Sequence, residues 1–151
     1  MRTDQPGELE DMLAGQLILA PLTRGGNVPF RRLCSDFGAN VTMSEMAYAR
    51  NLFKGWGAAR KREIALCKQS PLDSSKFGFQ VATKSSDELI RASQLALENG
   101  AAFIDLNCGC PIHEASRRGL GASMLKKPEA LLKMVRIASQ SCAGKSNFKF
   151  L

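Results

Sequence analysis

The sequence predicts an α/β domain in which parallel strands alternate with helices. Short apolar runs, typical of buried strands, are each followed by a stretch with apolar residues at helical spacing. These units follow one another along the chain, and no hairpin signal separates them. From this pattern a doubly wound sheet and the first half of a (β/α)8 TIM barrel both stay open. A complete barrel needs about 250 residues, whereas this chain has 151.

The first unit lies between residues 16 and 43. Residues 16–20 are a short apolar run ended by a proline, and they predict the first strand. Pro29 predicts the first turn of a helix because its fixed φ suits that position. This helix has apolar residues at helical spacing as far as Phe37 and is expected to stop at Gly38. Residues 40–43 then predict the second strand.

The middle of the chain repeats the pattern. Residues 46–57 carry aromatic and basic side chains and predict a loop, and residues 58–68 predict a second helix. Apolar residues alternate with Gly and Gln over residues 76–81, which predicts the third strand. The third helix is expected to be capped by Ser86 and to end at residues 99–100, Asn-Gly.

The last unit begins with residues 102–107, which predict the fourth strand. Pro128 opens a fourth helix, and its expected buried stripe consists of Leu131, Met134, Val135 and Ala138. Residues 147–151 predict the start of a fifth strand. We therefore expect an acidic amino-terminal segment, residues 1–15, and a partial barrel domain, residues 16–151.

The composition is typical of a soluble folded protein, with 44% hydrophobic and 23% charged residues. Its longest apolar stretches fall far short of the roughly 20 residues that a membrane helix needs. The amino end resembles neither a signal nor a transit peptide, so we expect an intracellular protein, cytoplasmic or nuclear. Five cysteines, an odd number, favour reduced thiols over a disulfide framework.

The net charge of +7 predicts an anionic partner, because a basic surface attracts phosphate groups whatever their sequence. Much of the excess comes from Arg50, Lys54, Arg60, Lys61 and Arg62. Arg117 and Arg118 add positive charge beside the Cys110 loop. A solvated helix face explains the same side chains, so both interpretations stay open.

The main candidate for chemistry is Cys110, in the segment Asp105-Leu-Asn-Cys-Gly-Cys-Pro111. It follows a buried strand, and parallel α/β folds build their active sites at the carboxyl ends of strands. A thiol with the ordinary pKa of about 8.5 is mostly protonated at neutral pH and can act as a general acid. Ligand spacing disfavours a metal site that joins Cys108 and His113. A nucleophile with His113 as its base is also disfavoured, since His113 need not face the thiol.

Other strand ends carry polar groups suited to a flat ring. Pro21, Leu22 and Thr23 follow the first strand with backbone amides and a hydroxyl. Gln80 ends the third strand with an amide that both donates and accepts, which suits the edge of a flavin or pyrimidine. Each of these residues is also explained by a purely structural role.

Strand alternation puts Asp105 and Asn107 on one side and Cys108 on the other. A buried carboxylate needs partners, so Asp105 is expected to be a structural hydrogen-bonding residue. Asn107, nearer the strand end, is expected to contact substrate or cofactor, and Cys108 is expected to pack. Residues 119–122, Gly-Leu-Gly-Ala, are expected to let their loop fold closely over a ligand.

Taken together, several segments resemble the tRNA-dihydrouridine synthases, above all the eukaryotic branch that modifies the variable-loop uridine. The segments are residues 20–23 (Ala-Pro-Leu-Thr), 27–32 (Asn-Val-Pro-Phe-Arg-Arg), 37–39 (Phe-Gly-Ala), 44–46 (Ser-Glu-Met), 79–81 (Phe-Gln-Val), 105–111 and 119–122. The resemblance implies a (β/α)8 barrel in which NADPH reduces FMN. The reduced flavin then passes hydride to C6 of a uracil flipped out of tRNA.

The resemblance also implies roles for single residues. The thiol matching Cys110 would protonate C5 of the uracil. Pro21, Leu22 and Thr23 with Gln80 would contact FMN, and the residue matching Asn107 would help to hold the ring system and the uridine. Arg117 and Arg118 are expected to contact RNA phosphates, which is inferred from their charge. No metal and no membrane are expected as partners.

Family features that follow the fourth strand are not recognisable in this sequence. These are a fifth-strand lysine, a later histidine, glycine-rich loops that bind the FMN phosphate and a helical tRNA-binding domain. We therefore expect the amino-terminal half of the barrel, and we expect this chain by itself to bind FMN poorly. Two alternatives stay open: a non-catalytic basic RNA-binding fragment, and another flavin-barrel oxidoreductase acting on a free pyrimidine. The sequence specifies neither the tRNA position nor the oligomeric state.

Overall fold

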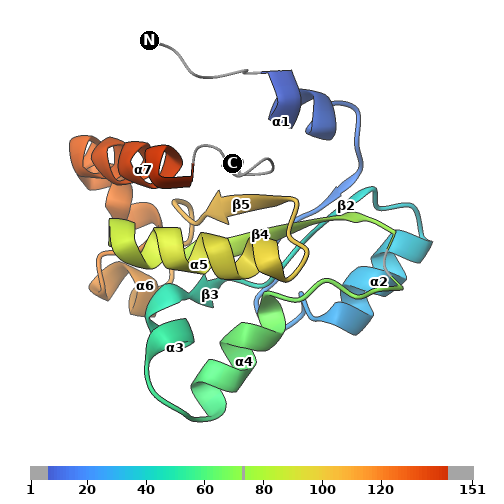
Figure 1. Ribbon diagram of the computed structural model, residues 1–151, viewed down its shortest axis with the longest axis horizontal. Helices are drawn as coiled ribbons and strands as arrows, with labels where there is room; N and C mark the ends of the chain where they lie inside the picture. Colours follow the sequence, from blue (N-terminus) through green and yellow to red (C-terminus); the bar gives the residue numbers. More distant parts are fainter. Residues whose placement is uncertain (1–6, 73, 143–151) are drawn as a thin grey trace.

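The computed structural model describes residues 7–72 and 74–142, and a five-stranded parallel sheet lies at its centre (Figure 1). The strands are β1 (Ile18–Leu19), β2 (Val41–Met43), β3 (Ala47–Tyr48), β4 (Lys76–Ala82) and β5 (Phe103–Leu106). Both β2 and β3 pair with β4, β2 near its start and β3 near its end. Residues 44–46 interrupt this otherwise single strand. The prediction of parallel strands alternating with helices is confirmed.

The order of the strands separates the two architectures that the sequence left open. β1 pairs with β2, β2 with β4, and β4 with β5, so neighbours in the sheet follow the order of the chain. A doubly wound sheet reverses its strand order at a switch point. None is present among the described strands, and this favours the barrel order.

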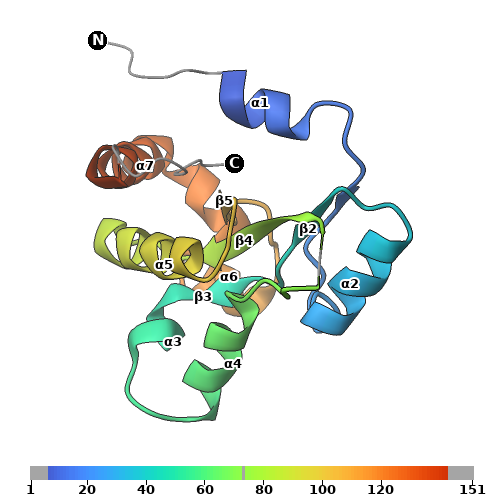
Figure 2. The same cartoon turned by 45° about the vertical axis from the view of Figure 1, so that its right-hand side comes forward.

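Helices surround the sheet, with α5 and α7 stacked side by side in both views (Figures 1 and 2). They are α1 (Gly7–Leu13), α2 (Val28–Asp36), α3 (Ala49–Phe53), α4 (Ala58–Leu66), α5 (Ser86–Glu98), α6 (His113–Arg117), the 3-10 helix η1 (Gly121–Lys126) and α7 (Pro128–Cys142). No helix in these described ranges combines the length and apolarity needed to cross a bilayer.

The two faces of the sheet are covered differently. Phe77, Phe79 and Ile104 belong to the main core, which is closed by α3, α5 and α7. Strand alternation turns Gly78 and Phe103 to the opposite face, where α1 packs its apolar side chains against a smaller cluster. Gln80 and Asp105 continue along this second face toward the strand ends, and the candidate site lies there.

Three local predictions are corrected. Residues 46–57 are not a loop throughout, since they contain β3 and α3, which are stabilised by pairing with β4 and by burial of Leu52. The cap of α5 is Ser85 rather than Ser86, because the Ser85 hydroxyl accepts the Glu88 amide. The first strand is shorter than expected, and Ile18 in it is 41% exposed. Residues 147–151 lie outside the described part of the chain.

Candidate active site

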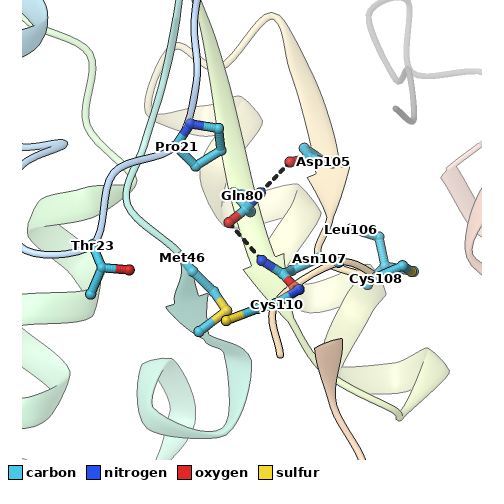
Figure 3. A pocket seen from close by; sticks show the side chains of 10 residues that line it. Pro21, Thr23, Met46, Gln80, Asp105, Leu106, Asn107, Cys108 and Cys110 are labelled. Atoms are coloured by element: carbon cyan, nitrogen blue, oxygen red, sulfur yellow. Dashed lines mark hydrogen bonds between the residues drawn. The ribbon is translucent and has the colours of Figure 1, made fainter. Parts of the chain in front are cut away.

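A pocket of about 370 Å³ opens at the carboxyl ends of the strands (Figure 3). Its lining residues come from segments distant in sequence: Pro21, Thr23, Met46, Gln80, Asp105, Leu106, Asn107, Cys108, Gly109 and Cys110. The structure thus brings together five of the predicted site residues. Leu22, Arg117 and Arg118 are not among the lining residues.

A chain of hydrogen bonds crosses the floor of this pocket. The backbone N–H of Cys110 donates to Asn107 Oδ1 at 3.0 Å. Asn107 Nδ2 donates to Gln80 Oε1 at 2.9 Å, and Gln80 Nε2 donates to Asp105 Oδ2 at 2.5 Å (Figure 3). A single network therefore connects the Cys110 loop to two neighbouring strands.

Asp105 sets the direction of this chain. An ionised carboxylate only accepts hydrogen bonds, so the Gln80 amide must turn its NH2 group toward Asp105 and its oxygen toward Asn107. The pKa of Asp105 is raised by burial, and the bond from Gln80 partly opposes the rise. The expectation that Asp105 is a structural hydrogen-bonding residue agrees with this arrangement.

Gln80 is also held through its main chain. Its N–H donates to the buried Ser44 hydroxyl at 2.8 Å, and that hydroxyl donates to the Glu45 carbonyl at 2.9 Å. Ser44 lies in the segment that interrupts the strand between β2 and β3. In the sequence this segment stands out only as part of the family pattern, and that pattern predicts no role for Ser44 or Met46.

The backbone of Cys110 is enclosed by the loop of residues 119–122. The Ala122 N–H donates to the Cys110 carbonyl at 3.0 Å. Gly121 has φ +60°, and a Cβ there would lie 2.3 Å from the Cys110 carbonyl oxygen. Only glycine fits this position without displacement. The close approach expected of this loop is thus made to Cys110 itself.

The other sulfur and imidazole groups nearby have different surroundings. Cys108 packs against the main core, as expected, and its pKa is raised by burial and by Asp105. His113 is exposed in the first turn of α6. No cluster of three metal-binding side chains occurs within the described ranges.

Pro21 and Thr23 are positioned by a tight turn. The N–H groups of Gly25 and Gly26 donate to the Leu22 carbonyl at 3.3 and 2.9 Å. The Leu22 side chain is 42% exposed and does not line the pocket. Its predicted contact with the flavin stays a prediction.

A buried arginine, Arg31, anchors this turn from below. It donates to the Gly26 carbonyl at 2.8 Å and to the Lys68 carbonyl at 2.7 Å. Its guanidinium lies 4.4 Å from the centre of the Phe77 ring. The role of Arg31 is not predicted by the sequence, because a surface arginine and a buried one have the same sequence pattern.

The two predicted phosphate contacts lie on α6 and beyond it. Arg117 is exposed. Arg118 forms an ion pair with Glu114 at 2.9 Å, and its guanidinium lies 5.3 Å from the centre of the Tyr48 ring. Lys84 Nζ donates to the Arg118 carbonyl at 2.9 Å. Arg118 is therefore partly neutralised, whereas the predicted RNA contacts of both arginines stay predictions.

Several known proteins are similar to this chain in sequence over most of its length. The chain is 41% identical over 140 residues to the tRNA-dihydrouridine(47) synthase (NAD(P)(+)) of Aspergillus fumigatus, a match covering 78% of this chain and 19% of the relative. It is 40% identical over 125 residues to the tRNA-dihydrouridine(47) synthase-like protein of Oryza sativa, covering 82% and 18%. The corresponding mouse protein is 37% identical over 125 residues, covering 82% and 19%.

The chain thus spans less than a fifth of the length of these relatives. The sequence model described as dihydrouridine synthase (Dus) matches residues 18–145, which include all strands of the sheet and the whole pocket lining. The match and the relatives together show that this chain belongs to the dihydrouridine synthase family.

Proposed function

We propose that this chain takes part in the reduction of a uridine in tRNA to dihydrouridine, with FMN as cofactor and NADPH as reductant. The observation that carries the proposal is the hydrogen-bonded series Asp105, Gln80, Asn107 and Cys110 around one pocket. Two side-chain amides and a thiol there are the groups needed to hold a uracil and protonate it. Relatives named as tRNA-dihydrouridine(47) synthases supply the substrate class.

The pocket lining fits the ring system of FMN better than its phosphate. Thr23, Gln80 and Asn107 offer hydroxyl and amide groups for a ring edge, and Pro21 and Met46 offer apolar surface. Each amide atom of Gln80 that already bonds to protein keeps one further donor or acceptor site. None of the ten lining residues is positively charged, so the phosphate would need residues outside this lining.

Cys110 is the proposed general acid. Thr23, Gln80 and Asn107 would hold reduced FMN in this pocket, where it would supply hydride to C6 of the uracil and leave C5 basic. The Cys110 thiol donates its proton to C5, and the resulting thiolate regains a proton from water. Asn107 and Ala122 hold the Cys110 backbone between them, which limits the thiol to a small region at the pocket edge.

The test replaces the gene in its cell by variants and measures dihydrouridine in tRNA, with protein levels followed by immunoblot. Cys110→Ala should lower the rate of dihydrouridine formation about 100-fold or more, because general acids contribute that much. Cys34→Ala is the matched control, since Cys34 lies on α2 and is not among the residues that line the pocket. Normal dihydrouridine in cells that contain the Cys110→Ala protein would exclude the proposed acid.

A second candidate function, RNA binding without catalysis, is favoured by the lack of a basic side chain among the ten lining residues and by the excess positive charge of the chain. A purified chain that binds tRNA with a steep salt dependence, yet has no flavin absorbance and reduces neither tRNA nor free uridine, would support it. A yellow, active preparation would instead support the synthase. Reduction of free uridine alone would indicate a pyrimidine oxidoreductase.

A further inference from the structure

An exposed surface on α3, α4 and their connecting loop combines positive charge with an aromatic ring. Residues 47–62 contain Arg50, Lys54, Arg60, Lys61 and Arg62 but no acidic residue. Trp56, the only tryptophan of the chain, lies in the same segment. We define the Trp56 surface as Arg50, Lys54, Trp56, Arg60 and Lys61.

The Trp56 side chain is presented to solvent almost completely. Trp56 is 94% exposed, which is the highest value among the exposed large hydrophobic side chains of residues 7–72 and 74–142. Gly55 before it has φ +56°, a left-handed conformation that suits glycine and turns the chain between the two helices. An exposed indole ring lacks the stabilisation that burial normally gives, and exposed apolar surface of this kind is typical of a binding site for a partner.

Arg60 holds the ring from one side. Its guanidinium lies 5.1 Å from the centre of the Trp56 ring. The Arg60 Nε also donates to the Leu52 carbonyl at 3.1 Å, so the guanidinium is anchored to the end of α3. A partner that stacks on the ring therefore meets a side chain already restrained, which lowers the entropy cost of binding.

The positive charges around the ring are mostly not neutralised. Of the basic residues in 47–62, Arg62 alone forms an ion pair within ranges 7–72 and 74–142, with Glu45. Arg50, Lys54 and Lys61 are exposed. Exposed cations beside an open aromatic ring match a polyanion that also offers flat rings, which describes RNA with unpaired bases.

Residues close in sequence to the Trp56 surface connect it to the candidate active site. Glu45, the partner of Arg62, precedes the pocket residue Met46. Tyr48 of β3 contacts Arg118, which directly follows α6. In Figures 1 and 2, α5 lies between α7 on one side and the pair α3 and α4 on the other.

We propose that the Trp56 surface binds RNA, with Trp56 stacking on an unpaired base and Arg50, Lys54 and Lys61 contacting the flanking phosphates. The proposal rests on the proposed function only for the identity of the RNA as tRNA. An acidic protein segment would pair with the basic side chains but would have no base to stack on Trp56. Stacking on Trp56 therefore distinguishes RNA from an acidic protein.

The first measurement uses the intrinsic fluorescence of the 151-residue chain, which reports Trp56 alone because there is one tryptophan. Unmodified tRNA transcript is titrated in, and heparin, a polyanion without bases, serves as the comparison. Stacking should quench Trp56 emission with tRNA, whereas heparin should bind with much less quenching. Equal spectral changes with both polyanions, or none with tRNA, would overturn the proposal.

The second measurement compares the tRNA affinity of variants by filter binding. Trp56→Leu should weaken binding about 5- to 100-fold, and Trp56→Phe should lose much less, because base–aromatic stacking contributes on this scale. An exposed side chain in an open loop can be replaced without loss of the fold. Wild-type affinity of Trp56→Leu would contradict the stacking role.

A charge-matched pair of double variants tests the phosphate contacts. Lys54→Ala with Lys61→Ala should reduce the slope of log affinity against log salt by about 1.4 to 1.8, since two phosphate contacts are lost. Lys133→Ala with Arg136→Ala removes the same charge from α7 and should leave the slope unchanged. Equal effects of the two pairs would refute a localised surface. If the wild-type protein binds tRNA as expected but forms no dihydrouridine, the proposed function is refuted and this inference still stands.

Discussion

Replacing Gly121 by Ala should displace Cys110, because these two residues make the closest backbone approach at the site. A Cβ at residue 121 would lie 2.3 Å from the Cys110 carbonyl oxygen, 3.2 Å from its carbonyl carbon and 3.3 Å from its Cβ. The first two contacts are with backbone atoms, which cannot rotate away as a flexible side chain does. Alanine would also have to adopt φ +60°, which L-residues disfavour.

Gly119→Ala is the matched control for this substitution. Gly119 has φ +73°, yet the nearest atom to a Cβ there is Lys84 Nζ at 3.6 Å, an ordinary contact. Gly119→Ala should therefore lower the free energy of unfolding by the backbone strain alone, about 1–2 kcal/mol. Gly121→Ala adds an overpacking cost of about 1–3 kcal/mol and should lower it by about 2–5 kcal/mol.

Urea unfolding of wild type and both variants measures these differences. The rate of Cys110 alkylation, followed by peptide mass spectrometry, reports the displacement of the thiol directly. Gly121→Ala should change that rate and Gly119→Ala should change it much less. If both variants lost the same stability and kept the wild-type alkylation rate, the contact between Gly121 and Cys110 would not position the thiol.

Three further predictions concern polar groups that are buried or half-buried. Arg31→Met should lower the free energy of unfolding by at least about 2 kcal/mol in urea titrations, because the carbonyls of Gly26 and Lys68 lose their donor; a change below about 0.5 kcal/mol would contradict it. Burial raises the pKa of Glu63 above 4.5, so the folded state binds its proton more tightly. Stability of wild type relative to Glu63→Gln should therefore fall as pH rises through the folded pKa, and a pH-independent difference in unfolding titrations would refute this. Asp105→Asn should change the rate of Cys110 alkylation while altering the free energy of unfolding by only about 1 kcal/mol. The reason is that the side-chain amides of Gln80 and Asn107 can then turn over and exchange donor for acceptor. An unchanged alkylation rate would show that Asp105 does not influence Cys110 through these hydrogen bonds.

Much of the fold was predictable because strand and helix periods are local properties. The run of residues 76–81 and the stripe of α7 are visible in the sequence, and the structure has a strand and a helix there. The element at residues 47–53 was missed because β3 has only two residues. A strand that short has no period of its own and is stabilised by pairing with β4.

Part of the candidate site was also predictable. Cys110, Asn107 and Gln80 each follow or end an apolar strand, and parallel strands bring such ends together. The hydrogen bonds that join them were not predictable, since they depend on the register of β4 against β5, in which Gln80 lies opposite Asp105. Nor does any local pattern assign Ser44 or Arg31 to the support of the pocket.

The sequence by itself determined the class of fold, the parallel strands, the thiol at a strand end and the resemblance to dihydrouridine synthases, because these depend on residue type and spacing along the chain. Tertiary structure alone decided the strand order, the direction of the amide chain and the closure of Gly121 on Cys110. It also decided that Trp56 is exposed and Arg31 buried. The physical reason is that contacts between distant segments depend on register and packing, which no single stretch of sequence contains.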